Sequence, residues 1–223
     1  MCGRYNFTSA GALQQRFDID GPLPELAPVY NVAPSLTMPV VVRHSPNSLQ
    51  LARWGFLLIW AEGKPGAREL INARDDNLLG SKTFRGPFAA SRCIVPATGF
   101  YEWRRDGATK TPYHIRLTGD RLFGFAGLLF PHAGRYGVEG PAYVIITTSP
   151  NRLMEPIHDR MPAILSPDDE DLWLDPDVSD PDVLLRLLRP YPDGEMDAYP
   201  ISPAVNSPRN NYADLIKPEV NSA

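Results

Sequence analysis

Closely spaced apolar segments between residues 92 and 148 constrain the fold of this chain more than any other feature. Four of them follow one another there: CIVPATGFYEW, YHIRL, LFGFAGLLF and AYVIITTS. Asp106-Gly107 and residues 118–120 (TGD) supply tight turns between the first three. Parallel neighbours need a crossover of a dozen or more residues, so such short connections join antiparallel strands. We therefore expect a mainly antiparallel sheet.

The flanking sequence adds further strands and peripheral helices. PVVVRH and LQLARWGF predict two strands joined by the polar SPNS turn. Thr8 or Ser9 is expected to cap a short helix that buries Leu13 and Phe17. We therefore expect an α+β fold, a single domain over residues 1–223 with a barrel-like antiparallel core and helices at its edges.

An acidic helical segment is expected at residues 166–198, within this domain. Ser166-Pro167 and Asp180-Pro181 are typical helix starts, and LLRLL gives the second helix an apolar face. The segment carries 11 acidic residues against two arginines, whereas residues 1–165 carry 18 Lys+Arg against 13 Asp+Glu. This asymmetry permits a basic functional face on an acidic protein. It equally permits a solvated acidic helix pair beside a neutral body.

Composition excludes several classes of protein. The two cysteines, Cys2 and Cys93, form neither a disulfide framework nor a zinc motif, so we expect no metal and no cofactor. No apolar run is long enough to span a membrane, and the N-terminal residues lack a basic stretch followed by an apolar run, so we do not expect secretion. We expect a cytoplasmic monomer with no obligate protein partner.

Cys2 holds an unusual position, directly behind Met1. Aminopeptidases remove methionine when the next residue is small, and cysteine qualifies. The chain would then begin with an amine and a thiol on adjacent carbons. This 1,2-aminothiol can close a five-membered ring on an aldehyde, which a lysine cannot do.

Three polar residues stand in apolar surroundings and are candidates for catalysis: Asn72 in LINAR, Glu102 in GFYEW and His158 in IHDRMP. Aromatic neighbours would desolvate Glu102 and raise its pKa, which suits a general acid. Each residue also has a structural alternative. Glu102 could pair with Arg104 or Arg105, His158 could be a hydrogen-bonded loop residue, and Asn72 could cap a turn.

Arginines accompany these candidates: Arg4 follows Cys2, Arg74 follows Asn72 and Arg160 follows His158, each at a distance of two residues. Guanidinium groups match phosphate oxygens, so the repetition favours an anionic ligand, although each one could form a surface ion pair. Trp60 could stack on an unpaired base, whereas Trp54 is expected in the core.

These residues belong to a series of motifs that resembles the SRAP family (SOS response-associated peptidases, which include the HMCES proteins). The resemblance runs in order along nearly the whole chain, and Leu58 stands where the family often has proline. Its motifs are MCGR at 1–4, YNVAP at 30–34, RWGF at 53–56, INAR at 71–74, RCIVPATGFYEW at 92–103, FAGL at 125–128, TT at 147–148, IHDRMP at 157–162, PIS at 200–202, VN at 205–206 and LIKP at 215–218.

The resemblance implies covalent capture of abasic sites in single-stranded DNA during a damage response. Cys2 would form a thiazolidine with the deoxyribose aldehyde, through lyase-like Schiff-base chemistry. Glu102 would act as the acid, His158 would move protons and Asn72 would orient Cys2. Arg4, Arg74, Arg160 and Trp60 would bind DNA, and the protein would associate with the nucleoid when bound.

Three alternatives stay open at this point. Cys2 could serve an N-terminal-nucleophile amidohydrolase, but such enzymes resemble one another in an Asn-Gly pair, which this sequence lacks. It could serve a peptidase that acts on itself or on other proteins, as the family name suggests. The arginines could also belong to a module that binds modified DNA without covalent chemistry.

Overall fold

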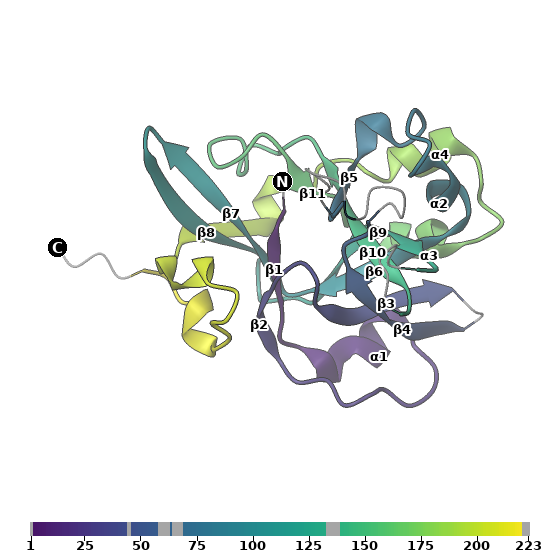
Figure 1. Cartoon of the computed structure of the whole chain (residues 1–223), viewed down its shortest axis with the longest axis horizontal. Coiled ribbons are helices and arrows are strands. Elements are labelled where there is room, and N and C mark those ends of the chain that lie inside the picture. The colour runs from purple at the N-terminus through teal and green to yellow at the C-terminus, as the bar shows by residue number, and fades with distance from the viewer. Residues whose placement is uncertain (1, 44–45, 58–62, 64–68, 133–138, 220–223) are drawn as a thin grey trace.

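The apolar strands close into a barrel in the computed structural model, which describes residues 2–43, 46–57, 63, 69–132 and 139–219 (Figure 1). Along these residues, β9 pairs back onto β10, and the only parallel neighbours within the ring are β10 and β4. This confirms the predicted α+β fold with a mainly antiparallel, barrel-like core. The ring runs β10 (Ala142–Thr148), β4 (Asn47–Trp54), β3 (Thr37–Arg43), β6 (Arg92–Ala97), β9 (Phe123–Phe130).

Three short strands extend this barrel. β5 (Asn72–Arg74) runs parallel to β10, and β11 (Met161–Pro162) runs antiparallel to the same strand. β12 (Ile164–Leu165) pairs with β9. The end of β10 therefore lies between the strands that carry the INAR and IHDRMP motifs.

A second sheet of five antiparallel strands stands beside the barrel (Figure 1). The segment CIVPATGFYEW supplies a strand to each sheet, because the chain turns out of the barrel at Thr98-Gly99. A Cβ atom at Gly99 would lie 2.3 Å from Nε2 of His114, so only glycine fits the turn. The order of the second sheet is β13 (Met196–Pro200), β8 (Thr109–Leu117), β7 (Gly99–Asp106), β1 (Arg4–Phe7), β2 (Val29–Val32).

One apolar core connects the barrel with the second sheet. Phe125 of β9 makes edge-to-face contacts with Tyr5 of β1 and Phe100 of β7, at centroid distances of 5.9 and 6.0 Å. Such pairs stabilise beyond their buried area. This packing fixes β1 and β7, and hence the residues at their ends, relative to the barrel.

The part of the chain that the structure describes has four α-helices, which lie at the edges: α1 (Leu13–Phe17), α2 (Arg85–Ala90), α3 (Pro167–Leu174) and α4 (Pro181–Arg186). α1 buries Leu13 and Phe17 as predicted, but neither predicted cap is made, because the Thr8 hydroxyl bonds Thr98 and Ser9 makes no cap bond. No pattern in residues 85–90 predicted α2. None of the described helices has the length and apolarity needed to cross a membrane.

The helix starts at Ser166-Pro167 and Asp180-Pro181 are confirmed. The side chain of Asp180 accepts from the Asp182 amide, whereas the hydroxyl of Ser166 bonds the Asp169 carboxylate. Leu184, Leu187 and Leu188 bury the face predicted for LLRLL. Short 3-10 helices cover residues Ala10–Ala12, Asp75–Asn77, Asp193–Glu195, Pro203–Asn206 and Ala213–Ile216.

The acidic segment is partly neutralised by arginines of the body. Glu170 receives both terminal nitrogens of Arg16, at 2.6 and 2.7 Å, and Asp171 pairs with Arg43 at 2.6 Å. Arg121 likewise pairs with Glu195 at 2.9 Å. Much of the positive charge of residues 1–165 is therefore offset internally, which leaves fewer cations for a ligand.

A buried histidine connects three strands of the second sheet and predicts how stability depends on pH. His114 is 2% exposed, and its ring nitrogens lie 2.8 Å from the Tyr199 hydroxyl and 3.0 Å from Asn6 Oδ1. Burial lowers the pKa of His114 from 6.5 to about 3. Between these values the unfolded chain binds a proton that the folded chain does not.

The free energy of unfolding is therefore expected to fall as pH falls below 6.5, by at most about 1.4 kcal/mol per pH unit from this residue. Denaturant titrations at neutral and mildly acidic pH measure the fall. His114→Gln should flatten it, while His132→Gln, at an exposed position, should not. An unchanged slope in His114→Gln would mean that the buried ring is protonated in the folded protein.

Candidate active site

Strand pairing brings the predicted catalytic residues together at one end of the second sheet. Arg4 of β1 lies opposite Tyr101 of β7, so Cys2 lies beside the part of β7 that carries Glu102. Nδ2 of Asn72, in β5, donates to the carbonyl oxygen of Cys2 at 2.8 Å. Nε2 of His158 lies 4.0 Å from Oε2 of Glu102.

The thiol of Cys2 is fully buried. Its sulfur donates to the carbonyl oxygen of Arg4 at 3.6 Å. Burial raises the pKa of the thiol, and the neighbouring Glu102 carboxylate raises it further. The raised pKa favours the protonated thiol over a standing thiolate.

Glu102 has the environment of a general acid. Its residue is 2% exposed, and burial raises the pKa of its carboxyl group, partly offset by nearby positive charge including that of His158. A raised pKa keeps the proton on the carboxyl group closer to neutral pH. The desolvation predicted from the flanking aromatic residues is thus present.

His158 is held so that either ring nitrogen can carry the proton. The backbone N–H of Arg160 donates to Nδ1 at 3.0 Å, whereas a carboxylate oxygen of Asp159 lies 2.8 Å from the same atom. The first contact requires a lone pair on Nδ1 and the second favours a proton there. These opposite demands keep both proton positions accessible, which suits a residue that passes protons to and from Glu102.

Asn72 offers an acceptor inside the site. While its Nδ2 is bound to Cys2, its Oδ1 is buried and meets no hydrogen-bond donor among the described residues. A buried unsatisfied carbonyl oxygen is costly, and such groups concentrate where a ligand or a reacting group completes them.

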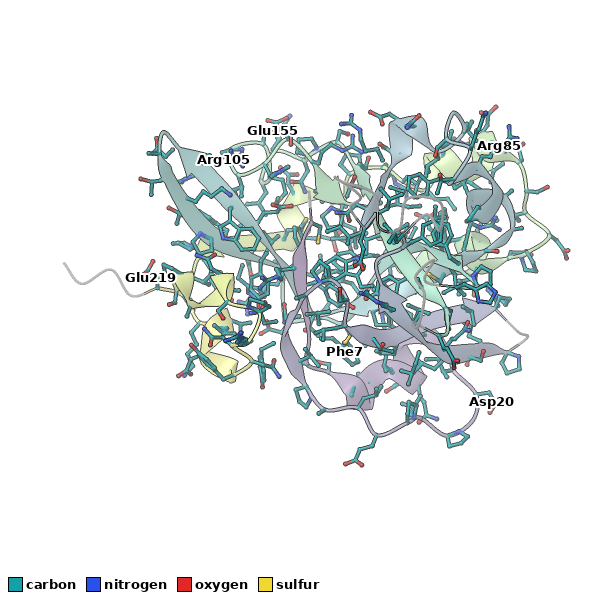
Figure 2. The ribbon with its side chains drawn as sticks, viewed as in Figure 1. Phe7, Asp20, Arg85, Arg105, Glu155 and Glu219 are labelled. Atoms are coloured by element: carbon teal, nitrogen blue, oxygen red, sulfur yellow. The ribbon has the colours of Figure 1, made fainter. Side chains whose placement is uncertain are left out.

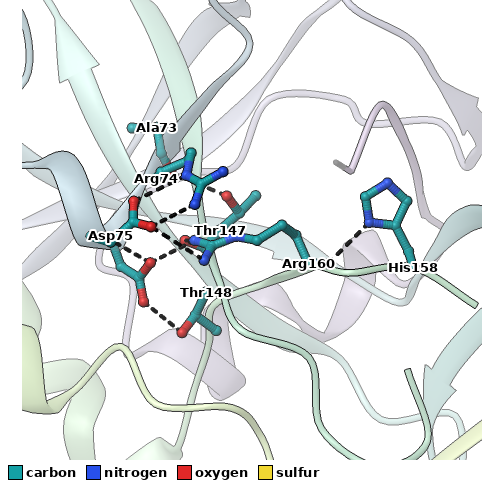
Figure 3. A network of polar contacts seen from close by, with 8 residues as sticks. Ala73, Arg74, Asp75, Thr147, Thr148, His158 and Arg160 are labelled. Atoms are coloured by element: carbon teal, nitrogen blue, oxygen red, sulfur yellow. Dashed lines mark hydrogen bonds and ion pairs between the residues drawn. The ribbon is translucent and has the colours of Figure 1, made fainter. Parts of the chain in front are cut away.

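Two of the predicted DNA-binding arginines are paired with carboxylates (Figure 3). Arg160 is 8% exposed, and its guanidinium donates to Asp75 Oδ1 at 2.5 Å and to the carbonyl oxygen of Thr147. Arg74 is exposed and binds Asp76 through two nitrogens, at 3.0 and 2.6 Å. Arg160 is therefore held in the fold, and Arg74 is the more accessible of the two.

The third arginine, Arg4, connects β1 with the C-terminal segment at residues 205–206 through hydrogen bonds. It donates to Asn31 Oδ1 at 2.8 Å and to the carbonyl oxygens of Val205 and Asn206 at 2.9 and 3.2 Å. Most of its hydrogen-bonding capacity is thus used within the fold. Trp60 lies outside the described residues.

Trp54 is in the core, as predicted. It is fully buried and its Nε1 donates to the carbonyl oxygen of Ile71 at 2.9 Å.

Sequence reasoning overlooked Asp75. Its carboxylate accepts from Arg160 and from the Thr148 hydroxyl, the latter at 2.7 Å, and so connects β10 with the end of β5 (Figure 3). Because the backbone of Arg160 contacts the ring of His158, Asp75 also supports the position of His158. The only sequence signal was the acidic pair that directly follows INAR.

Asp75→Asn is expected to lower the free energy of unfolding by about 1.5–3 kcal/mol, because the buried Arg160 loses its charged acceptor. Asp76→Asn is the matched control, since it breaks the exposed pair with Arg74, where water already solvates both groups, and removes only a 4.0 Å contact with Arg160. Chemical denaturation of both variants measures the difference. Equal losses would contradict a supporting role for Asp75.

The chain is similar to known proteins along most of its length. The SRAP family, described as SOS response associated peptidase, matches residues 1–208. The chain is 45% identical to the abasic site processing protein YoqW of Bacillus subtilis, over 97% of this chain and 99% of YoqW. It is 31% identical to the abasic site processing protein HMCES of Xenopus tropicalis, over 88% of this chain and 68% of that protein.

A solved structure shares the fold. The crystal structure of a protein from Bacteroides thetaiotaomicron superposes with a TM-score of 0.84 and 29% identity, and the match covers 98% of this chain and 100% of that one. Four of the motifs, MCGR, INAR, RCIVPATGFYEW and IHDRMP, carry Cys2, Asn72, Glu102 and His158. From the match over residues 1–208 and the extent of these likenesses, the chain belongs to the SRAP family.

Proposed function

We propose that this protein processes abasic sites in single-stranded DNA by covalent capture, in which Cys2 forms a thiazolidine with the open-chain sugar. One observation supports the proposal most strongly. Cys2, which can provide an aminothiol, lies close to the buried acid Glu102, the histidine His158 and the amide of Asn72. The names of the relatives, abasic site processing proteins, give the substrate class.

The reaction begins after Met1 is removed, when the α-amine of Cys2 is free. This amine, with a pKa of ~8, is partly unprotonated near neutral pH and attacks the aldehyde carbon. Loss of water leaves an imine. The sulfur then bonds to the same carbon, the thiol proton passes to nitrogen, and the five-membered ring is closed. Because the thiol of Cys2 holds its proton, the amine is the first nucleophile.

The remaining residues supply proton transfers. Glu102 protonates the ring oxygen as the sugar opens to its aldehyde, and its raised pKa keeps that proton available. His158, 4.0 Å from Glu102, receives and returns protons as the imine forms and reverses. Asn72 holds the main chain of Cys2 and offers Oδ1 to the freed amine.

The DNA contacts are assigned by exposure. Arg74 can exchange the Asp76 carboxylate for a phosphate, since both groups are exposed. Arg160 and Arg4 contribute positive charge from held positions. Trp60 is proposed to stack on a base, as the resemblance implies.

Incubation with an oligonucleotide containing one abasic site tests the proposal. Purified protein lacking Met1 should form a band that migrates slowly and survives heating without a reductant. Undamaged oligonucleotide of the same sequence should give no such band. Absence of the heat-stable band with the abasic strand would contradict covalent capture, whatever the affinity for DNA.

A further inference from the structure

The hairpin of β7 and β8 carries basic side chains that the site described above does not use. It projects from the second sheet at the end of the molecule opposite α4 (Figure 1). Arg104, Arg105 and Lys110 are exposed on it, against a single acidic residue at the tip, Asp106. Figure 2 marks Arg105 on this hairpin. Among the described residues, none of these three cations pairs with a carboxylate.

The charges of this hairpin are arranged unfavourably for the isolated protein. Arg105 and Lys110 lie directly opposite each other in the antiparallel pair, so their side chains share one face. Like charges in this arrangement destabilise a strand pair. By contrast, Arg74 and Arg160 near the active site are offset by Asp76 and Asp75. The hairpin is therefore a place where an external anion would relieve repulsion.

The hairpin also begins at the active site. Glu102 lies opposite Tyr113, and the guanidinium of Arg104 lies 5.2 Å from the centroid of the Tyr113 ring. Glu102, Tyr113 and Arg104 thus follow one another along one face, from the buried acid to the exposed arm. Four residues separate Glu102 from the tip, which corresponds to about 14 Å of strand.

We propose that the β7–β8 hairpin is a phosphate-binding arm that holds the DNA strand flanking the abasic nucleotide. This rests on the proposed function, because the strand is placed by the lesion in the active site. Arg104 and Tyr113, on the face that carries Glu102, offer a cationic and aromatic surface to the neighbouring nucleotide, and Arg105 and Lys110, on the opposite face, bind backbone phosphates farther along the strand where it passes the exposed tip. The contacts follow the backbone and carry no sequence preference.

The test measures non-covalent binding with oligonucleotides that contain tetrahydrofuran in place of the abasic sugar, because tetrahydrofuran has no aldehyde. The variant is Arg105→Ala with Lys110→Ala. The matched control is Arg186→Ala, which removes an exposed arginine of α4 at the other end of the molecule. Both probes carry the lesion at the centre, one being a trinucleotide and the other a long strand.

For the long strand, the double variant is expected to bind several-fold more weakly. The slope of log affinity against log salt should become shallower by about 0.7 for each lost phosphate contact. The trinucleotide is too short to reach Arg105 and Lys110 near the tip, so the double variant and the wild type should bind it equally. Arg186→Ala should match the wild type on both probes, and thermal melting checks that the variants are folded.

Unchanged affinity and salt slope of the double variant on the long strand would overturn the arm. An equal loss on both probes would also overturn it, because the effect would then arise at the lesion. Cross-linking of the wild type to a natural abasic strand is measured in parallel. If the wild type does not cross-link but the double variant still binds the long strand more weakly, the arm is supported and covalent capture is contradicted. If the wild type cross-links but the double variant binds the long strand normally, covalent capture is supported and the arm is contradicted.

Discussion

Replacing Glu102 with glutamine is expected to slow cross-linking to an abasic strand by about 10²–10⁴-fold, the usual contribution of a general acid. Glutamine keeps the shape of the side chain but has no acidic proton, so affinity for the tetrahydrofuran strand should be retained. Single-turnover rates measured on denaturing gels give the size of the effect. A normal rate in Glu102→Gln would leave Glu102 with a purely structural role.

The pH dependence sharpens this prediction. The reactive form needs protonated Glu102 and an unprotonated amine, and the pKa of Glu102 is raised by burial. With the pKa of Glu102 below the amine pKa of ~8, the wild-type rate is expected to rise with pH up to the pKa of Glu102. It should then stay level up to the pKa of the amine. Above the pKa of the amine the rate should fall, because the remaining protonated Glu102 is lost. Glu102→Gln should continue to rise up to the amine pKa and then stay level.

Glu170→Gln provides a matched control for the same substitution. Glu170 is also buried with a raised pKa, but it pairs with Arg16 at 2.6 Å on the α3 side of the barrel. Its replacement should cost stability through the unpaired arginine and leave the cross-linking rate of the folded protein unchanged. A similar slowing in both variants would point to a general loss of packing.

Most strands were predictable because their apolar segments are continuous and the turns on either side of β8 carry glycine at positive φ. Gly107 and Gly119 have φ values of 57° and 76°. The exchange of the chain between sheets at Thr98 was not predictable, because it depends on the contact of Gly99 with His114, which is distant in sequence. β5 has only three residues and forms by pairing with β10, so no local period marks it.

The residues of the site were also predictable only in part. Cys2 and Glu102 were identified from position and flanking aromatic residues, and the structure brings them together with Asn72 and His158. The arginines illustrate what spacing alone leaves undetermined. Each of the three arginines follows its candidate residue by two positions, but their environments differ. Arg4 binds the C-terminal segment, Arg74 is exposed, and Arg160 is buried and pairs with Asp75. Their differences arise from partners far away along the chain.

Removing the thiol of Cys2 is expected to abolish the heat-stable cross-link. Cys2→Ala keeps the α-amine and should still form an imine, which borohydride traps and which water otherwise hydrolyses. Cys2→Ser should fall between the two, since an oxazolidine can close but reopens readily. Denaturing gels with and without borohydride distinguish the three proteins. Cys93→Ala is the matched control, because this buried strand cysteine lies outside the proposed chemistry.

The amine is tested separately from the thiol. Acetylating the α-amine of the protein that lacks Met1 should abolish both products, while the thiol can still be titrated after denaturation. If the acetylated protein still couples, the thiol alone is the nucleophile and no thiazolidine forms. If Cys2→Ala gives a heat-stable product without borohydride, another residue carries the bond. If the acetylated protein keeps its thiol and yet forms no product, coupling requires both the amine and the thiol of Cys2. A 1,2-aminothiol places these two groups in one residue.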